Sequence, residues 1–196
     1  MRITLVDRDD FEAKNLCRQS FESLGNKAKV KARELAREFP GLSLRAIPEY
    51  VTESNIEEIV REGDIIFLAV DNHKTRLLVG RHCEALHDIV LISGGNELTD
   101  GNVQVYLRKG GQNLSLPLTE FHPEIQDHQD RSPAEMSCEE LQQASSPQLL
   151  FTNLAVASAM LNAFYSFRIG KLGYDEVYLD IVEGRMNPVA RGLRRS

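Results

Sequence analysis

The strongest constraint on the fold lies close to the start of the chain. There, an acidic residue directly follows a short apolar strand. Residues 3–6 have the apolar pattern of a strand, and Asp7 follows at once, with Asp9 two residues later. Asn15, Arg18 and Gln19 follow within the next ten residues. An acid at the carboxyl end of a parallel strand can accept ribose hydroxyls in doubly wound folds. The segment predicts a nucleotide site. The alternative is that Asp7 and Asp9 are only turn residues.

Apolar runs of strand length alternate with helical patterns over the first half of the chain. Strands are predicted at 3–6, 42–47, 65–70 and 89–93, and helices at 28–39, 55–61 and 74–86. Continuous apolar strands alternating with helices are typical of a parallel sheet covered by helices. The sequence therefore predicts the α/β class, with a Rossmann-like, mostly parallel sheet and helices on both faces.

The pattern changes in the second half of the chain. Alternation over 103–107, after the turn at Asp100 and Gly101, predicts a hairpin or another antiparallel addition. Residues 117–147 hold four prolines and many acids and are predicted to be a long loop. A final strand is predicted at 176–182, ending before Gly184 and Pro188.

One uncharged stretch of twenty residues, 148–167, has almost the length of a membrane span. Ser146 is predicted to cap this helix, with Pro147 in its first turn. Polar residues interrupt the stretch, and Ser158, Asn162 and Ser166 recur at a spacing of four, on one helix face. We therefore expect a buried helix with a small polar stripe, and no membrane association.

Charge and cysteine content exclude some classes of function. The 196-residue chain has a net charge of -6, whereas a dedicated nucleic-acid binder would be basic. The three cysteines are widely spaced and form no C-x-x-C pair, so no zinc is expected. The sequence shows no secretory leader, and a cytoplasmic location is predicted.

Two further positions are candidates for binding phosphates and magnesium. Asp71 and Asn72 directly follow the strand predicted at 65–70, where one carboxylate could hold Mg²⁺ against phosphates. The alternative is that one of them caps the next helix. Lys29, in the first turns of a helix, could reach a phosphate, although a solvated lysine is the simpler interpretation. Cys138 lies in the long loop, beside two glutamates that would raise its pKa.

Taken together, these residues resemble the ThiF/MoeB superfamily, the adenylating enzymes that activate ubiquitin-like and sulfur-carrier proteins. The D-x-D…N-L-x-R-Q run of that family reads here as Asp7, Asp9, Asn15, Leu16, Arg18 and Gln19. The family's phosphate-contacting lysine corresponds to Lys29. The family's magnesium-binding aspartate, which stands in a D-N…R motif, corresponds to Asp71, followed by Asn72 and Arg76. The second half most resembles ThiF-like proteins of the PRTRC mobile-element gene set, at Leu116-Pro117, at 121–124, at 137–139 and at 184–188.

The resemblance implies specific roles for these residues. Asp7, Asp9, Asn15, Gln19 and Asn72 would bind the nucleotide. Arg18 and Lys29 would act on the phosphates, and Asp71 would hold Mg²⁺. Cys138 aligns with a cysteine of the crossover loop that takes the activated acyl group in several members. ATP and the carboxyl-terminal glycine of a carrier would then give an acyl-adenylate and pyrophosphate, and a homodimer is expected.

The sequence departs from the family pattern in one respect that bears on activity. The family begins with a strand and a G-x-G-x-x-G turn, and we expect this first strand–helix unit to be missing here. The chain is expected to be one ThiF-like domain over 1–196. It would consist of a nucleotide-binding part (1–95), a hairpin and crossover loop (96–146), and a helix with the final strand (147–196). The alternative to an adenylyltransferase is a truncated or inactive binding or dimerisation module.

Overall fold

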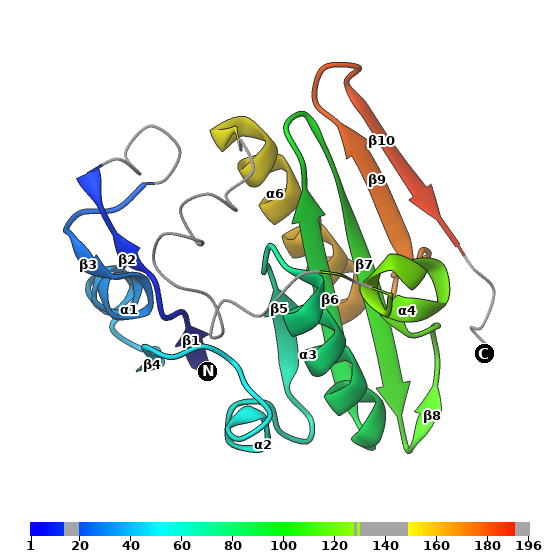
Figure 1. The fold of residues 1–196 in the computed structure, drawn as a ribbon, viewed down its shortest axis with the longest axis horizontal. Helices are drawn as coiled ribbons and strands as arrows, with labels where there is room; N and C mark the ends of the chain where they lie inside the picture. The colour runs from blue at the N-terminus through cyan, green and yellow to red at the C-terminus, as the bar shows by residue number, and fades with distance from the viewer. Residues whose placement is uncertain (14–19, 128, 130–148, 191–196) are drawn as a thin grey trace. The chain divides into compact units, whose positions relative to one another are not determined.

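The computed structural model describes residues 1–13, 20–127, 129 and 149–190, drawn in colour in Figure 1. The chain divides into two compact units, an N-terminal unit, Met1–Val51, and a C-terminal unit, Thr52–Ser196. Each unit has its own sheet.

The N-terminal unit is a small α/β arrangement. Strands β1 (Arg2–Val6) and β4 (Ser43–Ile47) pair in parallel, and helix α1 (Lys27–Glu38) packs on them, as Figure 1 shows in blue. Ala28 and Val30 are the buried residues of α1. The short strands β2 (Asp10–Phe11) and β3 (Gly25–Asn26) form an antiparallel pair before the helix. The predicted strand–helix–strand order of this region is confirmed.

The C-terminal unit contains one sheet in the order β10-β9-β7-β6-β5, with β8 paired to β7. The strands are β5 (Ile65–Leu68), β6 (Ile89–Asn96), β7 (Asp100–Lys109), β8 (Gln112–Asn113), β9 (Glu176–Asp180) and β10 (Arg185–Val189). Strands β5 and β6 run parallel, and each later pairing is antiparallel. The predicted α/β class is confirmed, as are the antiparallel additions in the second half.

Helices cover both faces of this sheet, which explains why β6 is apolar over residues 89–92 and buried over residues 89–94 (Figure 1). Val90 and Ile92 of β6 pack with Val103 and Val105 of β7 in one cluster, against α6 (Leu150–Arg168). The opposite face is covered by α3 (His73–Ala85) and α4 (Leu118–Phe121). Two further short helices of this unit are α2 (Ile56–Ile59) and the 3₁₀ helix η2 (Pro123–Ile125).

Two expectations about turns and loops are wrong. Within the region predicted as a loop, 118–121 and 123–125 are helical, because Pro117 and Pro123 begin these short helices rather than break structure. Beyond the predicted last strand, residues 185–189 form β10, which pairs with β9. Pro188 is accommodated there because β10 is the last strand of the sheet and needs no further donor on its free side.

Helix α6 is only partly buried, which corrects the expectation of a buried helix. Val156, Ala159, Met160 and Ala163 face the sheet, whereas the predicted polar residues Ser158 and Asn162 are exposed. By length and composition alone the helix could cross a membrane, and 28% of its most apolar window is buried in the protein. The predicted cap residues Ser146 and Pro147 lie outside the described residues.

Gly101 of β7 is required by the close approach of α6 and of the neighbouring strand. A Cβ atom at this position would lie 2.6 Å from the Gly95 carbonyl oxygen and 2.7 Å from Cγ2 of Val156. We expect Gly101→Ala to lower the free energy of unfolding by about 1–3 kcal/mol, because the backbone of β6 would have to move. Urea unfolding measures this, with Gly173→Ala as the control, since nothing lies within 4 Å of a Cβ there. Equal effects of both substitutions would contradict the packing argument.

Candidate functional site

Asp7 stands at the carboxyl end of β1, in the position that the sequence predicts. Its backbone N–H donates to the Ile47 carbonyl over 3.1 Å, which continues the parallel pairing with β4 by one residue. Its Oδ1 accepts from the backbone N–H of Asp9 over 2.8 Å, in a tight turn. Asp7 therefore stabilises a turn through one of its carboxylate oxygens, as the alternative interpretation predicted.

Asn26 links this turn to the start of helix α1, a role that the sequence analysis missed. Its amide nitrogen donates to the carbonyls of Asp7, Arg8 and Asp9, at 2.8, 3.2 and 3.1 Å. Its side-chain oxygen accepts from the backbone N–H of Lys29 over 3.1 Å, as the N-cap of the helix. One asparagine thus brings three of the predicted site residues together: Asp7, Asp9 and Lys29.

The carboxylate of Asp9 is engaged by two partners within the N-terminal unit. Lys27 Nζ lies 3.0 Å from its Oδ2, and the Tyr50 hydroxyl donates to its Oδ1 over 3.2 Å. Burial and the nearby charge of Asp9 raise the pKa of Tyr50 to about 12. Asp9 therefore fixes the turn after β1 in this structure, where the sequence predicts a nucleotide contact.

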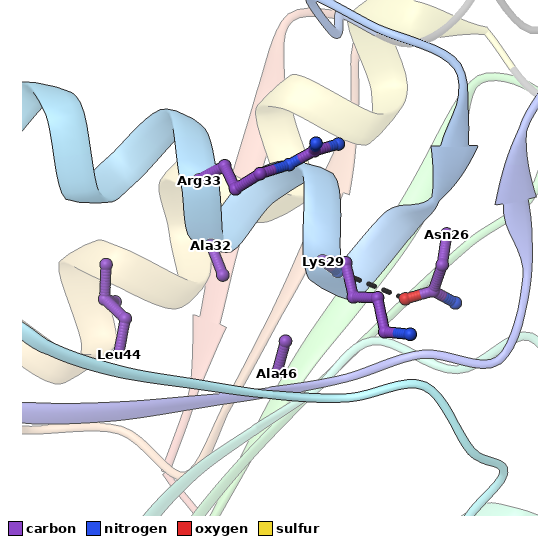
Figure 2. Close-up of a pocket in the computed structure, with 6 residues that line it drawn as sticks. All are labelled: Asn26, Lys29, Ala32, Arg33, Leu44 and Ala46. Atoms are coloured by element: carbon purple, nitrogen blue, oxygen red, sulfur yellow. Dashed lines mark hydrogen bonds between the residues drawn. The ribbon is translucent and has the colours of Figure 1, made fainter.

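Lys29 lines a depression of about 450 Å³ between α1 and β4, shown in Figure 2. Arg33 lies four residues further along the same helix face and shares the depression with Lys29. The remaining lining residues are Asn26, Ala32, Leu44 and Ala46. No acid is among the lining residues, so the two cations make this surface suited to an anion such as phosphate.

Asp71 and Asn72 follow β5 and have different roles. The side-chain oxygen of Asn72 accepts from the backbone N–H of Thr75 over 2.8 Å and caps α3. The helix-cap alternative is therefore confirmed for Asn72. Asp71 is exposed, just beyond the carboxyl end of the strand. A solvent-facing carboxylate in this place can bind a hydrated cation such as Mg²⁺.

Arg76 joins the carboxyl ends of β5 and β6 from helix α3. Its Nη1 donates to Ser93 Oγ over 2.6 Å, and its Nη2 donates to the carbonyls of Gly94, over 2.8 Å, and of Val70. Burial lowers the pKa of Arg76, and the charge of Asp71 acts in the opposite direction. The guanidinium stays charged at any physiological pH. Its contacts fix the strand end from which Asp71 projects.

Several predicted site residues lie outside the described residues: Asn15, Arg18, Gln19 and Cys138. Of the others, Asp7, Asp9 and Lys29 belong to the N-terminal unit, and Asp71 and Asn72 belong to the C-terminal unit. Cys83 is fully buried, and burial raises its pKa to about 12, which fits the packing role predicted for it. Among the described residues, no three His, Cys, Asp or Glu side chains form a metal-binding group.

A buried polar cluster in the C-terminal unit was not predicted. Glu176, at the start of β9, is 1% exposed, and its Oε1 lies 2.6 Å from Nε2 of His122. Asn102 of β7 donates to the same oxygen over 3.0 Å. The other ring nitrogen, Nδ1 of His122, lies 2.6 Å from Glu124 Oε1. Because an ionised carboxylate only accepts hydrogen bonds, both ring nitrogens donate and His122 is an imidazolium.

The pKa shifts agree with this assignment. Burial raises the pKa of Glu176, but hydrogen bonds from His122, Asn102 and Tyr178 outweigh it and lower the pKa to about 2. The hydrogen bond to Glu176 raises the pKa of His122, against burial, and Glu124 adds to the rise. The sequence held little signal for this cluster, since His122 and Glu176 are 54 residues apart.

Comparison with protein families and known proteins gives consistent results. The model of the ThiF family matches residues 1–178. Over 114 residues the chain is 32% identical to the adenylyltransferase and sulfurtransferase MOCS3 of Bos taurus and 33% identical to MOCS3-1 of Zea mays. These alignments cover 56% of this chain, and 25% and 24% of the relatives. The chain thus spans about a quarter of the length of the curated relatives it matches.

Solved structures with similar folds include enzymes with bound nucleotide. E. coli MccB with AMPCPP and selenomethionine MccA has a TM-score of 0.71 at 21% identity, covering all of this chain and 57% of MccB. PaaA has a TM-score of 0.69 at 16% identity, covering 95% of this chain and 63% of PaaA. These likenesses support the fold alone, and the family match covers most of the sequence. The chain therefore belongs to the ThiF family.

Proposed function

We propose that this chain is a ThiF-family adenylyltransferase that depends on ATP. Its substrate would be the carboxyl terminus of a ubiquitin-like or sulfur-carrier protein. The observation that carries this proposal is the placement of Asp71, an exposed carboxylate at the carboxyl end of β5, held there through the contacts of Arg76. A Mg²⁺ ion bound to this carboxylate would supply positive charge to the phosphates of ATP.

The N-terminal unit supports the same proposal with a second group of residues. Asp7 lies at the carboxyl end of β1, and an acid in this position suits a ribose hydroxyl. Lys29 and Arg33 present two cations on one helix face, and they would hold phosphates by charge and hydrogen bonds. Catalysis by such residues consists mainly of positioning and charge stabilisation. Arg18 and Gln19 are proposed to add to this phosphate site.

The class of substrate proposed for this chain is based on the similar proteins MOCS3 and MccB. MOCS3 is named as an adenylyltransferase and sulfurtransferase, and MccB has been solved with ATP and with MccA. A macromolecular acceptor with a free carboxylate is the substrate class we propose for this chain. Transfer of the activated acyl group to Cys138, the PRTRC subtype, a homodimer and a cytoplasmic location remain predictions from the sequence.

Calorimetry of ATP binding in the presence of Mg²⁺ tests the proposal. We expect the chain to bind ATP and Asp71→Ala to weaken binding by about ten- to a hundredfold, the loss expected for one interaction between charged groups. Removing Mg²⁺ with a chelator should reduce the difference between the two proteins. Asp127→Ala is the matched control, since it removes another exposed aspartate of the C-terminal unit.

The outcome also separates the two function classes. Binding that is lost in Asp71→Ala and kept in Asp127→Ala supports the adenylyltransferase. A folded chain that binds no ATP with Mg²⁺, in the presence or absence of a carrier protein, would overturn it. The second candidate, a binding or dimerisation module without catalysis, would then be favoured. It is supported by the exposed apolar surface of α6.

A further inference from the structure

The side chain of Asn102, on β7, has its orientation fixed by a buried carboxylate. Its Nδ2 donates to Oε1 of Glu176 over 3.0 Å, and Glu176 is 1% exposed. A side-chain amide has one donating end and one accepting end, whereas an ionised carboxylate only accepts hydrogen bonds. The nitrogen of Asn102 must therefore face Glu176, and Oδ1 must point to the other side of the amide.

On that other side, Asn102 meets the guanidinium of Arg76 beside Gly95. Asn102 and Gly95 are direct partners in the pairing of β7 with β6. A Cβ atom at residue 95 would lie 3.3 Å from Oδ1 of Asn102 and 3.0 Å from Nη2 of Arg76. The two side chains thus converge on one point, which is open because residue 95 has no side chain. With this orientation the negative end of the amide dipole lies toward a positive charge, which is the favourable arrangement.

Arg76 connects this point to the strand end that carries Asp71. Its Nη2 donates to the carbonyls of Gly94 and Val70, and Val70 directly precedes Asp71 in the chain. These acceptors are uncharged, so the guanidinium is held by the placement of several neighbouring groups rather than by one ion pair. A displaced guanidinium would release the Val70 carbonyl and, with it, the position of the next residue.

We propose that Asn102 is a positioning residue for the proposed magnesium site. Glu176 fixes the orientation of its amide, and Arg76 transmits the position of that amide to Asp71. His122 belongs to the same arrangement, because its imidazolium is the charged partner of the buried Glu176. Residues that support a metal ligand from behind commonly determine how well the ligand binds its metal. This inference rests on the proposed function, since it concerns residues behind the carboxylate that would hold Mg²⁺.

Calorimetry of ATP binding by Asn102→Leu and Asn102→Asp, with and without Mg²⁺, tests the inference. Leucine has nearly the shape of asparagine but no donor or acceptor, and aspartate would place a second carboxylate against Glu176. We expect each variant to weaken ATP binding by about tenfold or more in the presence of Mg²⁺, as is typical for residues that support a metal ligand. Both variants should have little effect once a chelator has removed Mg²⁺, because Asp71 would act through the ion.

Ser115→Ala is the matched control for a general loss of stability. Ser115 is buried and bonds Val105 and Leu107, further along β7. Its replacement should destabilise the same sheet and leave ATP binding unchanged. An equal loss of ATP binding in Ser115→Ala and Asn102→Leu would show that Asn102 has only a structural role.

The double variant Asn102→Asp/Glu176→Gln exchanges the donor and the acceptor. The new glutamine nitrogen would donate to the new carboxylate and to Nε2 of His122, whose neutral ring can accept there. An oxygen would then again lie toward Arg76. We expect this double variant to recover most of the ATP affinity that Asn102→Asp loses. A double variant that binds ATP no better than Asn102→Asp would overturn the inference.

Amide hydrogen exchange over residues 69–72 separates a failure of this inference from a failure of the proposed function. We expect faster exchange there in Asn102→Leu than in Ser115→Ala, because the end of β5 would open locally. If the unmodified chain binds no ATP, the proposed function is wrong, and the exchange rates decide the inference without it. Equal exchange in the two variants would overturn the inference. In a chain that binds ATP, full Mg²⁺-dependent affinity in Asn102→Leu would also overturn it.

Discussion

Replacing His122 with alanine is expected to lower the free energy of unfolding by about 3–5 kcal/mol, because it leaves a buried carboxylate without its main partner. Glu176 is 1% exposed, so the intact protein keeps its carboxylate away from bulk water and the imidazolium is its charged partner. Asn102, 3.0 Å from Oε1, and Tyr178 would remain as hydrogen-bond partners of the carboxylate, and both are uncharged. Urea unfolding at neutral pH measures the change. His87→Ala, which removes an exposed histidine of the same unit, is the control.

A second substitution separates the buried charge from lost packing. Glu176→Gln removes the charge but keeps the shape, so adding it to His122→Ala should recover part of the lost stability. If the double variant is as unstable as His122→Ala, then the unpaired carboxylate is not the cause. The cavity left by the imidazole would then account for the loss.

The same pair predicts how stability depends on pH in the unmodified chain. Glu176 has a pKa of about 2 against an ordinary value of 4.5, so its contribution is present above pH 4.5 and is lost as the pH falls through 2. The pKa of His122 is raised from 6.5, so its contribution is present below pH 6.5 and is lost as the pH rises through the raised value. Both contributions are therefore complete between pH 4.5 and 6.5. A shift of the stability maximum in Glu176→Gln away from this range checks the assignment.

The sequence predicted those elements of the fold that are marked by a local pattern of apolar and polar residues. The longer strands of the first half, β1, β4, β5 and β6, follow from apolar runs, and their predicted boundaries differ by only a few residues from the structure. The two-residue strands β2 and β3 were not predicted. Asp7 and Asp71 could be placed at strand ends for the same reason, since an acid directly after an apolar run marks where a strand leaves the core.

The unpredicted part depends on contacts between distant segments. His122, between α4 and η2, meets Glu176 of β9 only once the chain is folded, and neither residue has a local signal. Asn26 is similar, because its amide bonds to a turn 17 to 19 residues earlier in the chain. The error about α6 has a different cause. A long uncharged helix suggests a buried one, but the sheet covers only one of its faces and large apolar side chains remain exposed on another.

Replacing Arg76 with alanine should have the second large effect, because one side chain joins two strands and a helix. Its guanidinium contacts Ser93, Gly94 and Val70, and without it two carbonyls at the ends of β5 and β6 lose a donor. A hydrogen bond that involves a charged group contributes about 1.5–3 kcal/mol, so we expect a loss of about 3–5 kcal/mol in the free energy of unfolding. Urea unfolding measures this loss, with the exposed Arg81 of the same helix replaced by alanine as the control.

Arg76→Lys distinguishes geometry from charge at this position. Lysine keeps the positive charge but has no planar fork, and one ammonium group cannot replace the two nitrogens that reach acceptors on both strands. We expect Arg76→Lys to lose most of the stability that Arg76→Ala loses. It should also weaken ATP binding at temperatures where the variant is folded, because the strand end that presents Asp71 would no longer be fixed. A lysine variant with full stability and full ATP binding would show that positive charge alone is needed here, and that Arg76 does not position Asp71.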